Sequence, residues 1–501
     1  MDLTLPSDFT LQESTLKFLD SGPKQLLING EWVPALDGQT FSTVNPSNGE
    51  ELAQVALAGI EDVARAVHAA RAAFEMGPWG QMSGADRGEY LWKLAELIEQ
   101  HADELAELET LDNGKPLRVS RKGDLPAASK HFRYYAGWAS KLEGSTIPVS
   151  IPNQFVYSLR EPVGVVALII PWNFPLLMSA WKLAPALACG NTAILKPAEE
   201  TPLTALRLGE LVLEAGFPDG VINILTGPGE PTGAAMVANM GVDKVAFTGS
   251  TETGRKILRA SADSNLKKVS LELGGKSPNV IFADADIESA VKGANWAIFS
   301  TAGQECVAGS RLFIERPVYE QVLEGLRQQA GRIRVGSGFT PRVHIGPIIS
   351  AAQLERVMGY IESGRAQAEL ITGGERLGGE LAEGYFIQPT IFAHQEDEIP
   401  LVKDEIFGPV AAVTAFDSWE ELTTRANSSA YGLAAGVWTQ NLSKAHRFAR
   451  AVKAGTVWIN GYGMFDAAAP FGGYKESGFG REMGKQALDL YTQVKTVWVS
   501  L

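Results

Sequence analysis

Short apolar runs alternate with longer amphipathic stretches between residues 163 and 273. VVALII, TAILK, VINIL, KVAF and VSLEL are the short runs, and the stretches between them place apolar residues three and four positions apart. Short continuous apolar runs are typical of strands that are buried on both faces, as in parallel sheets. The alternation therefore predicts an α/β fold with a mainly parallel sheet and helices on both faces.

Helical spacing also marks residues 61–111, where acidic residues fill the positions between the apolar ones. These acids are predicted to form a solvated face. A further helix, LTALRLGELVLEA, is expected to take Thr201 as its N-cap with Pro202 at the first helical position, and to end at Gly216.

Residues 163–181 contain no ionisable side chain, and nineteen such residues are long enough to span a membrane. Pro171 and Pro175 instead divide the run into a strand and part of a helix, neither of which could cross a bilayer alone. Asn173 lies between the prolines, at the carboxyl end of a parallel strand, where ligand sites of α/β sheets collect. A turn-forming asparagine is the alternative interpretation.

Two segments fit neither pattern. STIPVSIP and QFVYSLRE, separated by Asn153, predict a hairpin, and TQVKTVWVSL predicts a last strand. Exposed strand edges of this length usually pair with another chain. Residues 144–162 and 488–501 are therefore expected to be oligomerisation strands of a homo-oligomer, either a tetramer or a dimer.

Composition excludes several classes of protein. A chain of 501 residues with 45% hydrophobic and 20% charged residues is globular and long enough for two or three domains. The net charge of -14 disfavours nucleic acid and anionic membranes as partners and leaves a small molecule as the expected ligand. The chain has two cysteines and no CxxC or HExxH spacing, so no metal site is expected. Reduced thiols and an N-terminus without a basic, apolar leader predict a cytoplasmic protein.

Cys306 is the strongest candidate nucleophile. It lies in FSTAGQECVAGSR, where Gly303 and Gly309 leave room for a ligand near the backbone. A lone cysteine is more often a small buried hydrophobe, and Cys189, at the apolar end of a helix, is given that interpretation.

Glu272 ends the predicted buried strand VSLEL and precedes two glycines. A carboxylate at such a place is costly unless it is paired or used, and burial would raise its pKa toward that of a general base. An ion pair with a lysine such as Lys276 is the alternative.

The glycine-rich stretches GPGEPTG and TGSTETG do not match the GxGxxG dinucleotide fingerprint. Even so, a strand followed by Gly-Ser-Thr at a helix N-terminus could receive a phosphate through backbone amides and the helix dipole.

Six motifs in one order, PWNFP, LKPAEETPLTAL, FTGST with LELGGKSPN, GQECVAGSR, KDEIFGPV and PFGGYKESGFGRE, resemble the aldehyde dehydrogenase superfamily. The resemblance extends from about residue 26 to the C-terminus. It implies a Rossmann-like NAD-binding domain over residues 1–143 and 163–273, an α/β catalytic domain over residues 274–476, and a small β oligomerisation extension.

The resemblance implies that Cys306 attacks the aldehyde, Asn173 stabilises the oxyanion and Glu272 activates the water that releases a carboxylic acid. Relatives that pass the thioester to coenzyme A typically lack this glutamate, so Glu272 favours hydrolysis. NAD is the implied cofactor, because the carboxylate of Glu199 would accept a ribose hydroxyl but repel the 2′-phosphate of NADP. The implied cofactor-binding residues are Trp172, Lys196, Glu199, Gly229, Gly249, Ser250, Thr253, Glu405 and Phe407.

A mostly apolar substrate funnel is also implied, which favours an aromatic or medium-chain aldehyde and is weakly similar to the phenylacetaldehyde-oxidising branch. Its residues are Phe174, Leu177, Met178, Trp181, Ser300, Glu305, Phe465, Asp466 and Phe471. Ser300 could widen the funnel, Asp466 could attract the amino group of an aminoaldehyde, and Trp181 could instead be ordinary core. A structural role like that of lens crystallins is the remaining rival.

Overall fold

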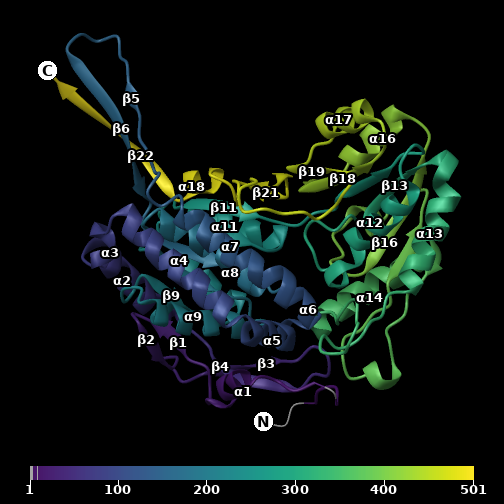
Figure 1. Ribbon diagram of the computed structural model, residues 1–501, viewed down its shortest axis with the longest axis horizontal. Coiled ribbons are helices and arrows are strands. Elements are labelled where there is room, and N and C mark those ends of the chain that lie inside the picture. Colours follow the sequence, from purple (N-terminus) through teal and green to yellow (C-terminus); the bar gives the residue numbers. More distant parts are fainter. Residues whose placement is uncertain (1–3, 8) are drawn as a thin grey trace.

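The largest sheet has eight strands and forms the centre of the blue and teal half of Figure 1. The computed structural model describes residues 4–7 and 9–501, so residues 1–3 and Asp8 of the expected NAD-binding domain lie outside the described residues. The strands follow the order β2 (Glu31–Val33), β1 (Leu26–Ile28), β9 (Ile222–Ile224), β8 (Thr192–Lys196), β7 (Val165–Ile169), β10 (Lys244–Thr248), β11 (Lys268–Glu272) and β21 (Gly478–Phe479).

The five strands from β9 to β11 are parallel and correspond to the five predicted apolar runs, which confirms the α/β expectation. From β7 the chain builds the sheet outward through β8 and β9, and then returns to place β10 on the other side of β7. The strand order therefore reverses between β7 and β10. A crevice at the carboxyl ends of strands is expected at such a point.

Helices cover both faces of this sheet. Alternate side chains of β7 point into two different hydrophobic cores. Val166 and Leu168 pack on one side with α4 (Gly84–Gln100), α7 (Leu125–Ala136), α8 (Pro175–Ala188) and α9 (Leu203–Ala215). Val165 and Ala167 pack on the other side with α2 (Ile60–Glu75) and α10 (Ala234–Ala238). This two-sided burial explains why the strands are apolar at every position.

The apolar run 163–181 divides as predicted into β7 and the first half of α8. Within residues 4–7 and 9–501, no helix is long and apolar enough to cross a membrane.

The predicted solvated face of acids is wrong for α5 (Ala102–Asn113), where Glu104, Glu107, Glu109 and Asp112 are buried. Each carboxylate has a partner from another element. Arg207 binds Glu104 at 2.8 Å, and the backbone N–H groups of Gln12, Leu176 and Leu203 donate to Glu107, Glu109 and Asp112 at 2.9, 3.2 and 3.0 Å. These three carboxylates therefore serve the N-termini of other helices, where negative charge is stabilising.

The predicted start of α9 is also wrong. Its N-cap is Pro202 and makes no side-chain cap, while the hydroxyl of Thr201 is buried without a partner. Asp112 takes over the capping role through its bond from Leu203 N. The predicted end is confirmed, because Gly216 closes α9 with a left-handed φ of 86°.

The second sheet lies in the green half of Figure 1 and has seven strands. Their order is β14 (Glu369–Thr372), β15 (Thr390–Ala393), β16 (Val410–Phe416), β13 (Arg311–Glu315), β12 (Pro278–Ile281), β18 (Ala434–Trp438) and β19 (Thr456–Ile459). Only β14 is antiparallel to its neighbour.

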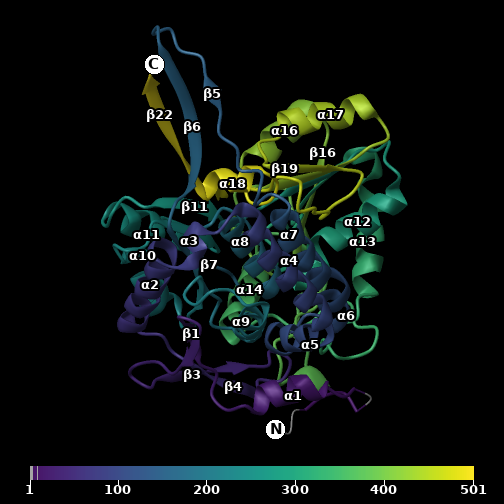
Figure 2. The ribbon, with the colours of Figure 1, turned by 60° about the vertical axis from the view of Figure 1, so that its left-hand side comes forward.

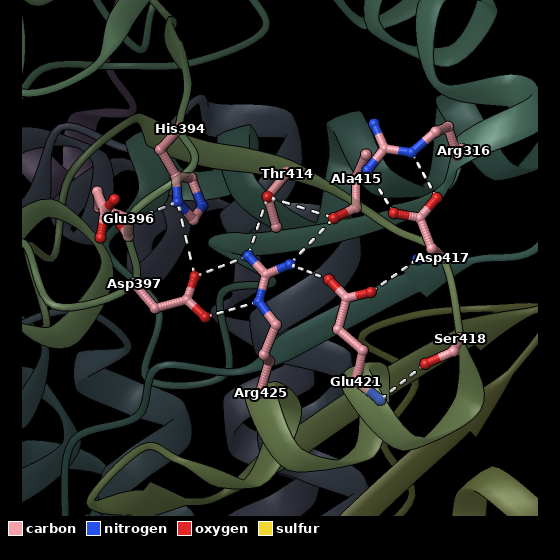
Figure 3. A network of polar contacts seen from close by, with 10 residues as sticks. All are labelled: Arg316, His394, Glu396, Asp397, Thr414, Ala415, Asp417, Ser418, Glu421 and Arg425. Carbon is pink, nitrogen blue, oxygen red and sulfur yellow. Dashed lines mark hydrogen bonds and ion pairs between the residues drawn. The ribbon is translucent and has the colours of Figure 1, made fainter.

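Arg425 anchors α16 (Trp419–Asn427) to this second sheet, as Figure 3 shows. Its guanidinium holds Asp397 through two bonds of 2.6 and 2.8 Å, and it donates to Thr414 Oγ1 at 3.0 Å and to Glu421 at 2.8 Å. Such a paired, bidentate arrangement fixes the helix in position. The network has a structural role: it joins α16 to the carboxyl-terminal half of β16 through Thr414.

Three strands form an arm that projects away from both sheets (Figures 1 and 2). β6 (Gln154–Pro162) lies between β5 (Thr146–Ile147) and the C-terminal β22 (Thr492–Ser500), with antiparallel pairing on both sides. The predicted hairpin and last strand are therefore confirmed.

Candidate active site

The turn after β7 directs Asn173 toward the loop that carries Cys306. Asn173 is buried, and its Nδ2 donates to the backbone carbonyl of Gln304 at 2.9 Å, across 131 positions of sequence. Its amide nitrogen carries a second N–H that this bond does not use. The contact joins the turn after β7 to the loop before β13 (Arg311–Glu315) and places an amide donor against the backbone two positions before the candidate nucleophile.

The loop before Cys306 is held in an unusual backbone shape. Thr301 and Ala302 have φ values of 48° and 54°, and a Cβ on Gly303 would lie 2.1 Å from the carbonyl oxygen of Gly408. The Gln304 side chain accepts from Ile349 N at 2.9 Å and donates to the carbonyls of Thr301 and Pro347. Left-handed residues persist only where the surroundings fix them, which is common at functional sites.

The Cys306 thiol is half-buried, whereas Cys189 is fully buried at the end of α8, as predicted. Burial raises the pKa of Cys306 well above its usual value, and the nearby carboxylates of Glu272 and Glu405 raise it further. The thiol is therefore protonated in this state, and it becomes a nucleophile only when a base or a positive charge stabilises the thiolate.

Glu272 ends β11 opposite Thr248 of β10 and is buried. Its Oε1 has no hydrogen-bond partner, and among the described residues Glu272 forms no ion pair with Lys276 or any other cation. Burial and the charge of Glu482 raise the pKa of Glu272 well above its ordinary value. A carboxyl group kept free of partners at the carboxyl end of a strand is suited to proton transfer.

Two carboxylates and a lysine occupy positions expected for cofactor binding. Lys196, at the end of β8, is buried and donates to Pro197 O at 2.9 Å, with Glu199 3.7 Å from its Nζ. Glu405 accepts from Gly275 N at 2.8 Å, and a Cβ on Gly274 would lie 2.2 Å from its Oε2. The two glycines of LELGG thus give the Glu405 carboxylate access to the backbone.

Helix α11 (Thr251–Ala262) begins at the end of β10. Ser250 caps it by accepting from Thr253 N at 3.1 Å, and a Cβ on Gly249 would lie 2.4 Å from the ring of Phe247. The hydroxyl of Thr248 is buried without a partner. A Cβ on Gly229, in the neighbouring loop, would meet nothing within 4 Å. The orphan hydroxyl, the helix N-terminus, Lys196 and Glu199 lie near the carboxyl ends of strands of the first sheet, and Glu405 approaches from the segment before β16. Together these groups can make the hydrogen bonds that a dinucleotide needs.

Trp172 and Phe407 meet edge to face with ring centroids 5.2 Å apart, although their segments belong to the first and second sheets. Phe407 has a left-handed φ of 60°. The predicted cofactor residues of the two halves therefore come together at Trp172 and Phe407.

The predicted funnel residues gather as an aromatic cluster. Ring centroids lie 6.1 Å apart for Trp181 and Phe465, 5.5 Å for Trp181 and Phe471, and 5.4 Å for Phe465 and Phe471. Leu177, Met178 and Trp181 share one stripe of α8, and Phe174, the residue just before the helix, continues the same spacing.

Ser300, Glu305 and Asp466 differ in environment. Ser300 is buried at the end of α12 (Ile287–Phe299). Burial raises the pKa of Glu305, and hydrogen bonds from Ser300 and Thr301 partly offset this rise. Asp466 is exposed, and its carboxylate accepts from Ala468 N at 2.9 Å. Asp466 therefore shapes a local turn.

Asn113 and Glu109 support the site but were not predicted as functional residues. Asn113 Nδ2 donates to Trp172 O at 2.7 Å and to Asn173 O at 3.4 Å, and Glu109 accepts from the N–H of Leu176, the second residue of α8. Both come from the segment LETLDNGKP, where a glutamate on a helix and an asparagine near a helix end are ordinary residues. What the sequence lacked was the spatial proximity of this helix end to the turn of Asn173.

Comparison with known proteins agrees with this geometry. The model of the Aldehyde dehydrogenase family matches residues 32–497. The mitochondrial aldehyde dehydrogenase of Rattus norvegicus is 52% identical over 95% of this chain and 92% of its own length. The mitochondrial benzaldehyde dehydrogenase of Antirrhinum majus is 51% identical over 95% of this chain and 89% of its own. An NAD+ complex of the aldehyde dehydrogenase from Bacillus cereus has a TM-score of 0.96 at 52% identity, covering 98% of this chain and 99% of that chain.

The chain belongs to the aldehyde dehydrogenase family. This confirms the family and the fold expected from its motifs.

Proposed function

We propose that this protein oxidises an aldehyde to the carboxylic acid through a thiohemiacetal and then a thioester on Cys306, and that water releases the acid. That the protein is an NAD-dependent oxidoreductase of aldehydes follows from its family and from the NAD+ complex of its Bacillus cereus relative. The remaining steps rest on the arrangement of Asn173, Glu272 and Cys306.

In the first step the Cys306 thiol loses its proton and the sulfur attacks the aldehyde carbon. The second N–H of the Asn173 amide, with the backbone N–H of Cys306, would then stabilise the developing oxyanion. Because Gln304 holds the other half of the Asn173 amide, the donor needs no reorientation during the reaction.

Bound NAD supplies the acceptor for the hydride that leaves the thiohemiacetal carbon. Lys196 and Glu199 would hold one ribose, Gly249, Ser250 and the N-terminus of α11 the pyrophosphate, and Glu405 the other ribose. The carboxylate of Glu199, whose side chain is 42% exposed, favours NAD over NADP, since it would repel a 2′-phosphate.

The unpartnered carboxyl of Glu272 carries the proposal of hydrolysis. A group with a raised pKa and a free Oε1 can accept a proton from water and return it, whereas a carboxylate committed to an ion pair could not. Transfer of the thioester to coenzyme A would leave this buried acid without a function.

An aromatic or medium-chain aldehyde fits the cluster of Trp181, Phe465 and Phe471. The Antirrhinum majus relative, named a benzaldehyde dehydrogenase, supports the aromatic class. An aminoaldehyde is the alternative substrate class, because the exposed Asp466 carboxylate keeps its charge while one of its oxygens accepts from Ala468 N.

The projecting arm supports a homo-oligomer, a tetramer or a dimer. Its strands expose Phe155, Leu159, Val494 and Trp498, with 45%, 41%, 64% and 52% of each residue accessible. Exposed apolar side chains on a projecting sheet, together with the unpaired outer edge of β22, are typical of subunit contacts. A cytoplasmic location is supported by two cysteines that are both free thiols.

The proposal is tested by following NADH absorbance with purified protein, NAD and phenylacetaldehyde, benzaldehyde, hexanal and an aminoaldehyde, with and without coenzyme A. We expect turnover without coenzyme A and release of free acid. Cys306→Ala should abolish it, and Cys189→Ala is the matched control that keeps it. A strict requirement for coenzyme A, or no NADH with any aldehyde, would contradict the proposal.

A further inference from the structure

Two buried polar groups next to the aromatic cluster have no partner. Trp181 Nε1 and His131 Nε2 are both inaccessible and unpaired. The two rings stack with centroids 5.6 Å apart and an interplanar angle of 23°. Buried polar groups normally find hydrogen bonds, so two orphans on stacked neighbours call for a ligand or an ordered water.

The chemistry of the two groups is complementary. His131 Nδ1 lies 2.9 Å from Ala127 O, and since a carbonyl only accepts, the proton is on Nδ1. Burial lowers the pKa of His131 to about 4, so its ring is neutral and Nε2 is an acceptor. The indole Nε1–H of Trp181 is a donor only. The pair thus offers one acceptor and one donor, which is the complement of a hydroxyl group.

The position of Trp181 connects the pair to the aldehyde site. On α8, Leu176, Ser179, Ala180 and Lys182 are 0% exposed, whereas Trp181 keeps 5%. Phe174 and Leu177 of the same stripe are half-buried. Trp181 Nε1 itself is inaccessible, so the pair is linked to the predicted funnel by the ring contacts of Trp181 with Phe465 and Phe471, whose centroids lie 6.1 and 5.5 Å away.

The distance from the start of α8 to Trp181 sets the size of the ligand. Trp181 lies six positions after Pro175, which is about 9 Å along the helix axis. Side chains of a helix lean back toward its N-terminus, so the indole lies somewhat closer to Asn173 than its Cα. This span accommodates one aromatic ring with a short carbon chain ending in the aldehyde.

We propose that Trp181 Nε1 and His131 Nε2 form the polar end of the aldehyde pocket and bind a hydroxyl group carried at the far end of an aromatic aldehyde. The hydroxyl oxygen accepts from the indole N–H and donates its proton to the imidazole nitrogen. The inference deepens the proposed function and rests on it, because it names the substrate class as hydroxyaryl aldehydes.

The test compares kcat/KM for 4-hydroxyphenylacetaldehyde and 4-methylphenylacetaldehyde, which have nearly the same shape. The wild-type protein should prefer the hydroxyl compound by about tenfold or more, because the methyl group leaves both buried groups unpaired. Trp181→Phe and His131→Phe should each lower this ratio by about tenfold. Trp92→Phe is the control, since the Trp92 indole is exposed and bonded to Glu96, and it should keep the wild-type ratio.

Titration calorimetry with 4-hydroxyphenylacetate and 4-methylphenylacetate repeats the comparison on the wild-type protein without turnover. Tighter binding of the hydroxyl compound is expected. Equal binding of both acids, a wild-type kcat/KM ratio near one, or a ratio unchanged in both variants would overturn the proposal and leave the pair with a water. Absence of NADH from every aldehyde would refute the proposed function instead, while the calorimetric comparison would still decide the binding pair.

Discussion

At the scale of the residue, the chemistry depends on three side chains from separate segments. Asn173 follows β7, Glu272 ends β11 and Cys306 precedes β13. Only the Asn173 amide is fixed by a direct bond to the nucleophile loop, through Gln304 O. The other two groups are left without ion pairs, and burial raises the pKa of each.

Asn173→Ala removes the side-chain donor for the oxyanion. We expect kcat to fall by about 10²–10³ fold with the fold intact, since loss of one oxyanion donor has this effect. Steady-state kinetics and circular dichroism measure the two quantities. A near-normal rate would return Asn173 to the role of a turn former.

The pH dependence of turnover should report Glu272. Its deprotonated form is the active base, so kcat should fall as pH decreases through a pKa well above 4.5. Glu482→Gln removes a negative charge that raises this pKa, so the acid limb should move to lower pH. Glu476→Gln is the control, because Glu476 is an exposed partner of Arg255. An acid limb that stays in place in Glu482→Gln would contradict this assignment.

The sequence predicted a functional role where the residue type was unusual for its position. An amide between two prolines, a carboxylate in a buried strand and a thiol among glycines all violate local expectations. Asn113 and His131 do not, because an asparagine near a helix end and a histidine on an amphipathic helix are ordinary. Their roles depend on which element lies opposite them.

At the scale of the element, α5 shows that buried carboxylates can organise other helices. Glu107, Glu109 and Asp112 receive N–H groups at the starts of α1 (Glu13–Asp20), α8 and α9. A solvated acidic face and a buried capping face have the same spacing in the sequence. Pattern alone could not distinguish them, because the partners lie from 67 to 95 positions away.

Asn113→Ala should misplace the turn that holds Asn173, because the Asn113 amide binds the carbonyls of Trp172 and Asn173. We expect kcat to fall by roughly tenfold to hundredfold. Asn265→Ala is a matched control, since the Asn265 amide also holds two carbonyls, those of Met240 and Val242, in a different loop. Equal rates in the two variants would show that Asn113 has no role in positioning the turn.

At the scale of the whole molecule, the alternation of strands and helices predicted the first sheet but not the strand order. β7 lies centrally because the chain returns past it to form β10. The short β21, from residues 478 and 479, also joins this sheet beside β11. A two-residue strand paired over such a distance leaves no periodic signal in the sequence.

The arm provides the prediction at this scale. Trp498→Glu places a charge on the exposed apolar surface of β22 and should shift the protein to a smaller species. Sedimentation velocity measures the mass, and Trp92→Glu on α4 is the control because Trp92 is similarly exposed, at 47%. An unchanged mass in Trp498→Glu would argue against this face of the arm as the subunit contact.

The central claim is that Glu272 releases a thioester from Cys306 by activating water. Rapid-mixing absorbance of Glu272→Gln with NAD and phenylacetaldehyde tests it most directly, with intact-mass analysis of the quenched protein. We predict a single burst of NADH close to one per site, little further turnover, and an acyl group retained on Cys306. Full steady-state turnover without a retained acyl group would contradict the account.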